Sequence, residues 1–134
     1  MKVEGGCHCG AIAYEADVDP NSARICHCTD CQTLTGSAFR VAVPAPAATF
    51  RLLRGAPKIY IKTADSGTRR AHAFCDNCGA PIYAAAPENT ASYSLRVGAL
   101  KQRAAIGKPR QQIYCRSALP WAMELGSIDK NDLG

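Results

Sequence analysis

Eight cysteines in a chain of 134 residues constrain this sequence more than any other feature. Seven of them fall into three short groups, at 7–9, 26–31 and 75–78, and Cys115 stands alone. The opening residues, MKVEGGCHCG, lack the apolar core of a secretory signal, so we expect a cytosolic protein. Because disulfides rarely persist in the cytosol, the cysteines indicate metal binding or catalysis.

The first and third groups share a glycine directly after their second cysteine. They read Cys-His-Cys-Gly at 7–10 and Cys-Asp-Asn-Cys-Gly at 75–79. In a metal-binding knuckle a tight turn aims backbone N–H groups at the sulfur, and glycine suits the positive φ that such a turn can require. Two knuckles brought together from distant parts of a sheet form a tetrahedral zinc site. The simpler alternative is that the first two cysteines are only small buried thiols. We predict a structural zinc site whose ligands are Cys7, Cys9, Cys75 and Cys78.

The middle group, CHCTDC at 26–31, has three cysteines and no glycine after the last one. Structural zinc sites have four protein ligands, whereas catalytic sites have three and keep one position for a substrate. Three thiolates around Zn²⁺ leave a local charge of about −1, which makes the metal a weak Lewis acid but lets it bind an incoming thiol as the reactive thiolate. We therefore predict a catalytic zinc on Cys26, Cys28 and Cys31, with a substrate sulfur as fourth ligand.

Two alternatives for the middle group stay open. One is a metal-free redox cluster. The second is a fourth ligand from elsewhere in the chain, for which the candidates are His8, His27, His72 and Cys115. His8 and His27 each lie between two cysteines, so we expect their rings to point away from the metal. Cys115 is most simply a packing residue, and a reactive thiol next to Arg116 is the alternative.

Short β-prone segments recur about every ten residues, separated by Gly, Pro, Asp or Ser, which is typical of an all-β domain. No window shows a sustained helical pattern, and we expect at most a short helical turn after Cys31. The PAPAA run at 44–48 is expected to form a bend. The fold class predicted is mainly β, with small antiparallel sheets. The predicted strands are 11–17, 39–43, 49–53, 58–62, 69–74, 81–84, 92–97 and 111–115.

Length and composition fit one globular domain, which we assign to residues 1–134, with the tail after about residue 122 left undefined. No apolar run approaches the roughly 18 residues of a membrane span, so we expect no membrane association. The formal charge of +5 falls to about +2 once seven bound thiolates and two zinc ions are counted. That surplus is too small to predict a nucleic-acid partner.

Four blocks of the sequence resemble the family of glutathione-dependent formaldehyde-activating enzymes and the related centromere protein V. They are GGCHCGAIAYE at 5–15, CHCTDCQTLTGSAF at 26–39, FCDNCGAPIY at 74–83 and RSALPW at 116–121. The resemblance implies the β-tent fold, in which small sheets are arranged around a structural zinc. It also implies two zinc ions, a structural one on the first and third cysteine groups and a catalytic one on the middle group.

The activity that the resemblance implies is that of a carbon–sulfur lyase, which joins formaldehyde to the thiol of glutathione or releases it. Glutathione carries two carboxylates, and an arginine of the basic 51–70 stretch would bind one of them through two N–H groups. Gly36 and Ser37, a few positions after Cys31, would form part of the wall beside the zinc, and Trp121 would cover the site. The substrate-contacting residues expected on this basis are Arg69, Arg70, Gly36, Ser37 and Trp121.

Two alternative functions remain. One is a zinc-structured binding module without catalysis. The second is a thiol reductase centred on Cys115, because YCRSAL resembles the active-site strand of methionine sulfoxide reductase B, in which a cysteine attacks the sulfoxide. That enzyme uses two pairs of cysteines and no three-cysteine site, so this match is partial.

Overall fold

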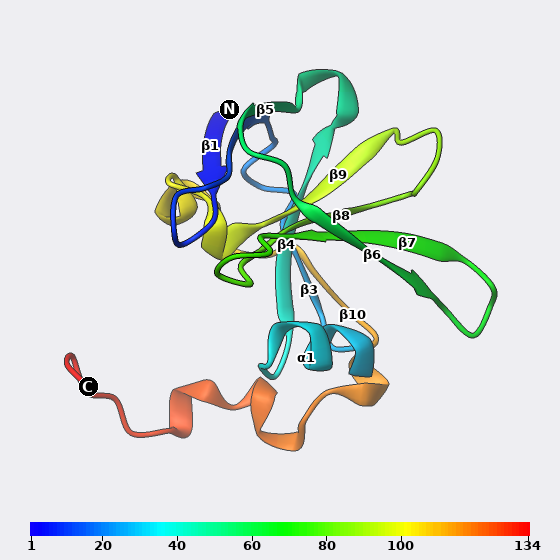
Figure 1. The fold of residues 1–134 in the computed structure, drawn as a ribbon. Helices are drawn as coiled ribbons and strands as arrows, with labels where there is room; N and C mark the ends of the chain where they lie inside the picture. Colours follow the sequence, from blue (N-terminus) through cyan, green and yellow to red (C-terminus); the bar gives the residue numbers. More distant parts are fainter.

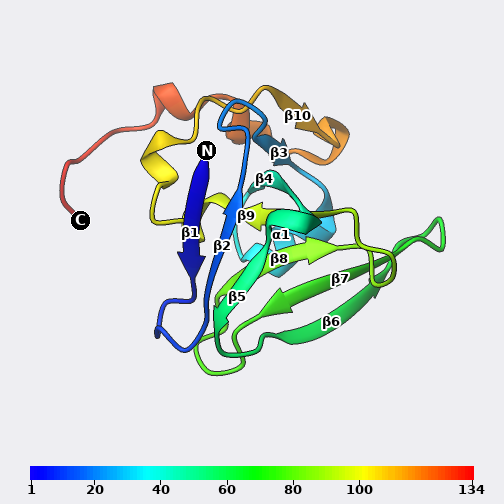
Figure 2. The ribbon, with the colours of Figure 1, turned by 90° about the horizontal axis from the view of Figure 1, so that it is seen from above.

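The computed structural model describes residues 1–134, which form ten β-strands, one α-helix and several short 3₁₀ turns. The strands form two sheets, shown from two directions in Figures 1 and 2. The smaller sheet is antiparallel and has the order β1 (Lys2–Gly6), β2 (Ala13–Asp17), β5 (Arg51–Arg54). The predicted mainly β fold is confirmed, and this sheet has the expected antiparallel pairing.

The larger sheet has seven strands, and every neighbouring pair is antiparallel except β10 and β3, which are parallel. Figure 1 shows it fanning out from β10 beside the helix to the long β6–β7 hairpin. In spatial order its strands are β10 (Gln111–Ile113), β3 (Arg24–Cys26), β4 (Arg40–Pro46), β9 (Ser92–Arg96), β8 (Pro81–Ala85), β7 (Arg69–Phe74) and β6 (Lys58–Thr63).

Each predicted strand overlaps an observed one, but β1 and β3 were not predicted. β1 ends in two glycines, which are depleted in strands, and β3 has only three residues. The bend predicted at 44–48 is wrong in its first part, because β4 continues through Pro46. Beyond Ala42, β4 is no longer paired with β3. The prolines there lie along a free edge, where a missing N–H is tolerated.

Both sheets contribute to one hydrophobic core. Phe50, just before β5, packs its ring against those of Tyr14, Tyr83 and Tyr93, with centroids 5.4, 5.4 and 4.4 Å apart. Contacts among these large rings help to join the two sheets. The fully buried side chains of greatest volume are Tyr14, Ile82, Leu95, Leu100, His27, Val3, Val43 and Cys75.

The single helix, α1 (Thr29–Thr35), begins earlier than the helical turn expected after Cys31 and contains that cysteine. The reason is local: Cys28 caps the helix, and its sulfur accepts a hydrogen bond from the N–H of Cys31. After β10 the chain forms only short 3₁₀ turns, and its end extends away from the sheets in Figure 1. None of the helices combines the length and the apolar character needed to cross a membrane.

Candidate metal centres

The first and third cysteine groups meet in the structure. Cys7 and Cys9 lie in the loop between β1 and β2, and Cys75 and Cys78 lie in the turn between β7 and β8. Their four sulfur atoms all lie within 4.8 Å of one another. The Cys7–Cys9 and Cys9–Cys75 sulfur distances are 3.6 and 3.7 Å. Sulfurs bound to one tetrahedral zinc at about 2.3 Å lie about 3.8 Å apart, so this cluster fits a single zinc ion.

The two turns that carry these cysteines have the same backbone hydrogen bond. The N–H of Cys7 donates to the carbonyl of Ile12 at 3.2 Å, and the N–H of Cys75 donates to the carbonyl of Ala80 at 3.0 Å. In the first turn the N–H of Ile12 returns a hydrogen bond to the Cys7 sulfur at 3.1 Å. The expected N–H donation to sulfur is therefore present.

The glycines after the cysteine pairs adopt the left-handed conformation. The φ angle is 83° at Gly10 and 76° at Gly79, values that residues with a Cβ atom rarely adopt. The surrounding donors also favour the ionised form of two of the thiols, those of Cys9 and Cys78. A hydrogen bond from the Asn77 side chain lowers the pKa of Cys9 to about 6, and the backbone N–H of Ala80 lowers the pKa of Cys78. Thiolate is the form that binds a metal.

The middle group forms a second cluster. Cys26 ends β3, Cys28 caps α1 and Cys31 lies in the first turns of that helix. Their sulfurs lie within 4.8 Å of one another, and all three side chains are partly buried. No histidine, carboxylate or further cysteine brings a ligand atom within that distance of all three sulfurs. The chain therefore provides three ligands here and four at the first cluster.

The three thiols of the second cluster cannot lose their protons independently. A hydrogen bond from Cys31 lowers the pKa of Cys26 to about 5, whereas the same interaction, together with burial, raises the pKa of Cys31. One thiolate is thus stabilised by the thiols beside it. A metal cation between the three sulfurs would favour the thiolate form of all of them, and soft thiolate donors suit zinc.

The residues considered as a fourth ligand lie elsewhere. The ring of His27 is fully buried, and its Nε2 lies 2.7 Å from Oε1 of Gln112 on β10. His72 lies on β7 and contacts two arginines instead. His8 and Cys115 are exposed, the first in the four-cysteine loop and the second in a 3₁₀ turn.

The loop that carries the three cysteines is fixed by its neighbours. The side-chain amide of Gln32 donates to the carbonyls of His27 and Ser117 at 2.8 and 2.9 Å. An ion pair of 2.7 Å between Asp30 and Lys62 ties α1 to β6. Gln32 was not predicted from the sequence, although a glutamine next to a ligand cysteine is a reasonable candidate for such a contact.

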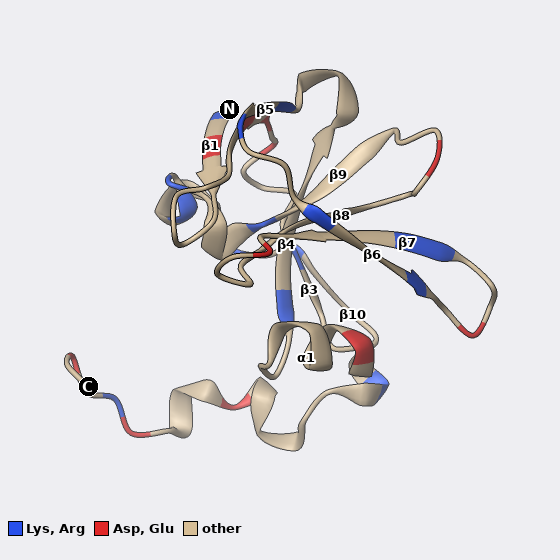
Figure 3. Ribbon diagram, in the orientation of Figure 1, with Lys and Arg blue, Asp and Glu red and all other residues tan.

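Strand register places the second cluster on one face of the larger sheet. Directly paired residues point to the same face of a sheet. The chain of pairs runs Cys26–Arg40, Ala42–Arg96, Ser94–Ala84, Ala84–His72 and His72–Tyr60. Residues two apart on a strand also share a face, so these pairs all lie on one side of the sheet. We call this side, which carries Cys26, Arg40, Arg96 and His72, the cysteine face. Figure 3 shows the basic segment of β4 close to α1, and the basic segments of β6 and β7 along the hairpin that these two strands form.

The structure separates the two arginines that were expected to bind substrate. Arg70 lies two residues before His72 and shares its face, whereas Arg69 points to the opposite face. Arg69 is exposed and lies 3.5 Å from Glu88. Only Arg70 is therefore on the side of the second cluster.

The remaining expected substrate contacts are spread along the chain. Gly36 ends α1 in the left-handed conformation with φ of 62°, and the exposed Ser37 follows it. Trp121 lies in the 3₁₀ turn Pro120–Met123 and is 48% exposed, and it lines neither of the two cavities near the cysteine face.

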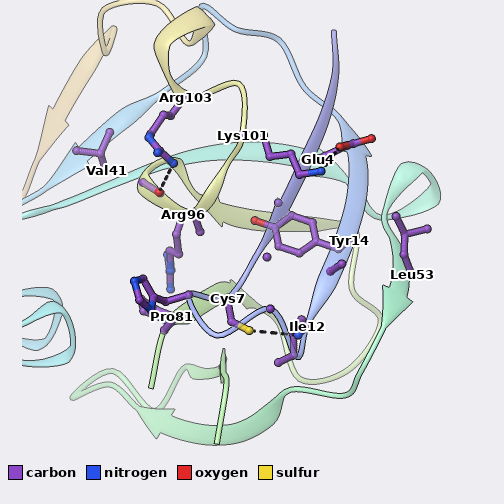
Figure 4. Close-up of a pocket in the computed structure, with 18 of the residues that line it drawn as sticks. Glu4, Cys7, Ile12, Tyr14, Val41, Leu53, Pro81, Arg96, Lys101 and Arg103 are labelled. Atoms are coloured by element: carbon purple, nitrogen blue, oxygen red, sulfur yellow. Dashed lines mark hydrogen bonds and ion pairs between the residues drawn. The ribbon is translucent and has the colours of Figure 1, made fainter. Parts of the chain in front are cut away.

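These two cavities meet next to the cysteine face. The larger, of about 840 Å³, lies between the sheets and is lined by residues of the four-cysteine loop, such as Cys7 and Ile12. The smaller, of about 300 Å³, lies beneath α1 and is lined by Tyr60 and His72. Both are bordered by the same three residues, Arg40, Pro81 and Arg96. Figure 4 shows the larger cavity, with Arg96 next to Pro81 and with Tyr14 to the right of both. No cysteine of the second cluster lines either cavity.

Arg40 and Arg96 were not predicted from the sequence as site residues. Each is an arginine within an apolar or alternating strand segment, FRVAV and SYSLRV, and is more than nine-tenths buried in the structure. Such buried charge is unusual, but only the strand register shows that the two side chains meet.

Fold and cysteine clusters together define a mainly β protein with two separate groups of thiols able to hold metal ions. The sequence model of the family described as glutathione-dependent formaldehyde-activating enzyme matches residues 2–117. The chain belongs to this family. Its structure is also similar to the crystal structure of a Rhodobacter sphaeroides protein solved in a structural genomics programme. The TM-score is 0.63 at 26% sequence identity, with 81% of this chain and 98% of that one covered.

Proposed function

We propose that this protein is a zinc-dependent carbon–sulfur lyase that joins a small aldehyde to a thiol, or releases it, at the three-cysteine cluster. Membership of the glutathione-dependent formaldehyde-activating family makes glutathione and formaldehyde the first substrates to test. The observation that carries the proposal is the convergence of the Cys26, Cys28 and Cys31 sulfurs, with no fourth ligand from the chain. A cluster with three protein ligands can accept a substrate sulfur without losing one of its own.

The chemistry is an addition to a carbonyl group. The thiol sulfur bonds to the aldehyde carbon, the π electron pair of the carbonyl moves to oxygen, and the proton lost by the thiol ends on that oxygen. When bound, zinc would supply the positive charge that favours the thiolate form of an incoming thiol at neutral pH.

The chain's own contribution is to hold the cluster in place. Cys26, Cys28 and Cys31 would be the metal ligands, and the amide of Gln32 and the Asp30–Lys62 ion pair fix the loop and helix that present them. Fixed positioning of two reactants can supply a large part of the rate acceleration for a reaction that already proceeds in solution.

The four-cysteine cluster is proposed to bind a structural zinc. Its ligands would be Cys7, Cys9, Cys75 and Cys78, which come from loops of both sheets. We propose that residues 1–134 act as one zinc-binding domain around this ion. None of the eight cysteines forms a disulfide, which agrees with the proposed cytoplasmic location.

The proposal is tested by metal analysis combined with one substitution. The intact protein should contain about two zinc ions per chain. Cys28→Ala should lose one of them together with all lyase activity, measured by consumption of formaldehyde in the presence of glutathione, while circular dichroism shows an unchanged fold. A single tightly held zinc in the unmodified protein, or full activity in Cys28→Ala, would contradict the proposal.

Cys115→Ser is the matched control, because Cys115 is exposed and belongs to neither cluster. It should keep both zinc ions and the lyase activity. The reductase alternative makes the opposite prediction for a different reaction, namely that Cys115→Ser abolishes the reduction of methionine sulfoxide.

A further inference from the structure

We infer that Arg40 and Arg96 form a binding subsite for a carboxylate of the thiol substrate, beside the three-cysteine cluster. The inference rests on the proposed function for the identity of the ligand as a thiol, but the subsite itself follows from contacts within the chain. It assigns the carboxylate to two residues that lie outside the 51–70 stretch.

Both arginines are buried, and neither side chain has an acidic partner. Arg40 is 5% exposed and Arg96 is 6% exposed. Neither takes part in any of the four ion pairs of the structure. The Nε atoms of both are buried without a hydrogen-bond partner. A buried charge without a partner is costly, so such groups are normally paired or bound to a ligand.

The single protein group within hydrogen-bonding distance of the two guanidinium groups is the ring of His72. Nη1 of Arg40 and Nη2 of Arg96 each lie 3.4 Å from its Nδ1. Burial, followed by the charges of Arg96 and Arg40, lowers the pKa of His72 to about 4, so the ring is neutral at pH 7 and Nδ1 can accept. A neutral acceptor brings the guanidinium groups together but leaves their charges uncompensated.

The charges around the pair strengthen this conclusion. Asp30 of α1 is engaged by Lys62 at 2.7 Å, and Glu4, which lines the larger cavity, is engaged by Lys101 at 2.6 Å. Three thiolates around a divalent ion would carry one net negative charge, which would offset one of the two guanidinium groups. At least one positive charge on the cysteine face is therefore available for an anion.

Geometry favours a carboxylate that belongs to the thiol substrate. Arg40 is the direct strand partner of Cys26, and Arg96 is paired with Ala42 two residues further along β4, so both arginines leave the sheet on the face that carries Cys26. Both arginines border both cavities, which gives a ligand room on either side. The planar guanidinium binds a carboxylate through two parallel N–H bonds, and two such groups that meet at one point suit one carboxylate.

The first experiment measures anion binding without catalysis, on the zinc-loaded protein. Sodium propionate should raise the melting temperature more than an equal concentration of propionamide with sodium chloride, because the folded subsite binds the carboxylate in preference to the amide or chloride. Arg40→Met and Arg96→Met should both remove this difference. Each variant should be at least as stable as the unmodified protein at low salt, since it removes a buried unpaired charge, whereas a purely structural role would lower its stability.

The second experiment compares two thiols that differ in one group. With formaldehyde as co-substrate, 3-mercaptopropionate should be preferred to 3-mercaptopropanol, mainly through a lower KM. Arg96→Met should reduce this preference about 10- to 100-fold, the usual effect of losing a hydrogen bond to a charged group. Arg51→Met, which removes an exposed charge on β5, is the control and should leave the preference unchanged.

The results separate this inference from the proposed function. Turnover of both thiols with no preference for the carboxylate would overturn the subsite and leave the lyase intact. The subsite would also be overturned if Arg69→Met or Arg70→Met, rather than the Arg40 and Arg96 variants, abolished the preference. Stabilisation by propionate that depends on the arginine pair, without turnover of any thiol, would support the subsite and contradict the lyase.

Discussion

The two cysteine clusters are built from the same ligand atom but by different parts of the fold. The four-cysteine cluster joins two turns, and its Cys9 and Cys75 are 66 positions apart in the chain. The three-cysteine cluster comes from six consecutive positions at the end of β3 and the start of α1. One closes a long loop of the chain, whereas the other is a local structure attached to the sheet. Metal binding and folding should therefore be coupled at the first cluster and largely separate at the second.

Loss of a ligand from the four-cysteine cluster should have the largest effect. Cys78→Ser removes one ligand, and because Cys78 is exposed it removes little packing. A structural zinc in a small site contributes roughly 10 kcal/mol of binding free energy, which is comparable to the whole stability of a domain. We expect a chain that has lost its cooperative thermal unfolding transition, measured by circular dichroism. A melting temperature equal to that of Cys115→Ser would show that this cluster does not hold the fold together.

Gradual removal of metal should show an intermediate effect that separates the clusters. A chelator titrated into the zinc-loaded protein is expected to take zinc first from the three-cysteine cluster, which has one protein ligand fewer. Lyase activity should disappear in this first phase while the circular dichroism spectrum is unchanged. The second phase should coincide with unfolding. Release of both ions in a single step with loss of structure would mean that the clusters are not independent.

Replacement of a turn glycine should have the smallest effect on stability. Gly79→Ala adds a Cβ atom where φ is 76° and nothing lies within 4 Å, so the cost is backbone strain of about 1–2 kcal/mol. Gly67→Ala places the same strain in the β6–β7 turn, where φ is 86°, at the opposite end of β7 from Cys75. Both variants should unfold at a lower temperature, by similar amounts.

Zinc affinity distinguishes these two glycine variants. Gly79→Ala should also release zinc from the four-cysteine cluster at a lower chelator concentration, because the turn sets the direction of the N–H groups and sulfurs. Gly67→Ala should release it as the unmodified protein does. Equal zinc affinity in both variants would show that the left-handed turn serves the fold alone.

Much of the fold was predictable because its signals are local. Alternation of apolar and polar residues identified β7 at 69–74 with the observed bounds. The glycines after Cys9 and Cys78 predicted left-handed turns, which the structure contains. Predictions failed where local signals were weak or conflicted with pairing. β3 is too short for a recognisable pattern, and the prolines of β4 indicated a bend although pairing with β9 keeps the strand extended.

The residues able to bind metal could be identified from the amino-acid order alone, since cysteine spacing and the following glycines are properties of a few neighbouring positions. The side chains that lie beside those cysteines could not. Arg40 and Cys26 became neighbours through the pairing of β3 with β4, and Arg96 joined them through β9. Strand register depends on packing across the whole sheet, and a shift of one residue would turn every side chain to the opposite face. The electrostatic character of the cysteine face is therefore a property of the assembled sheet and not of any one segment.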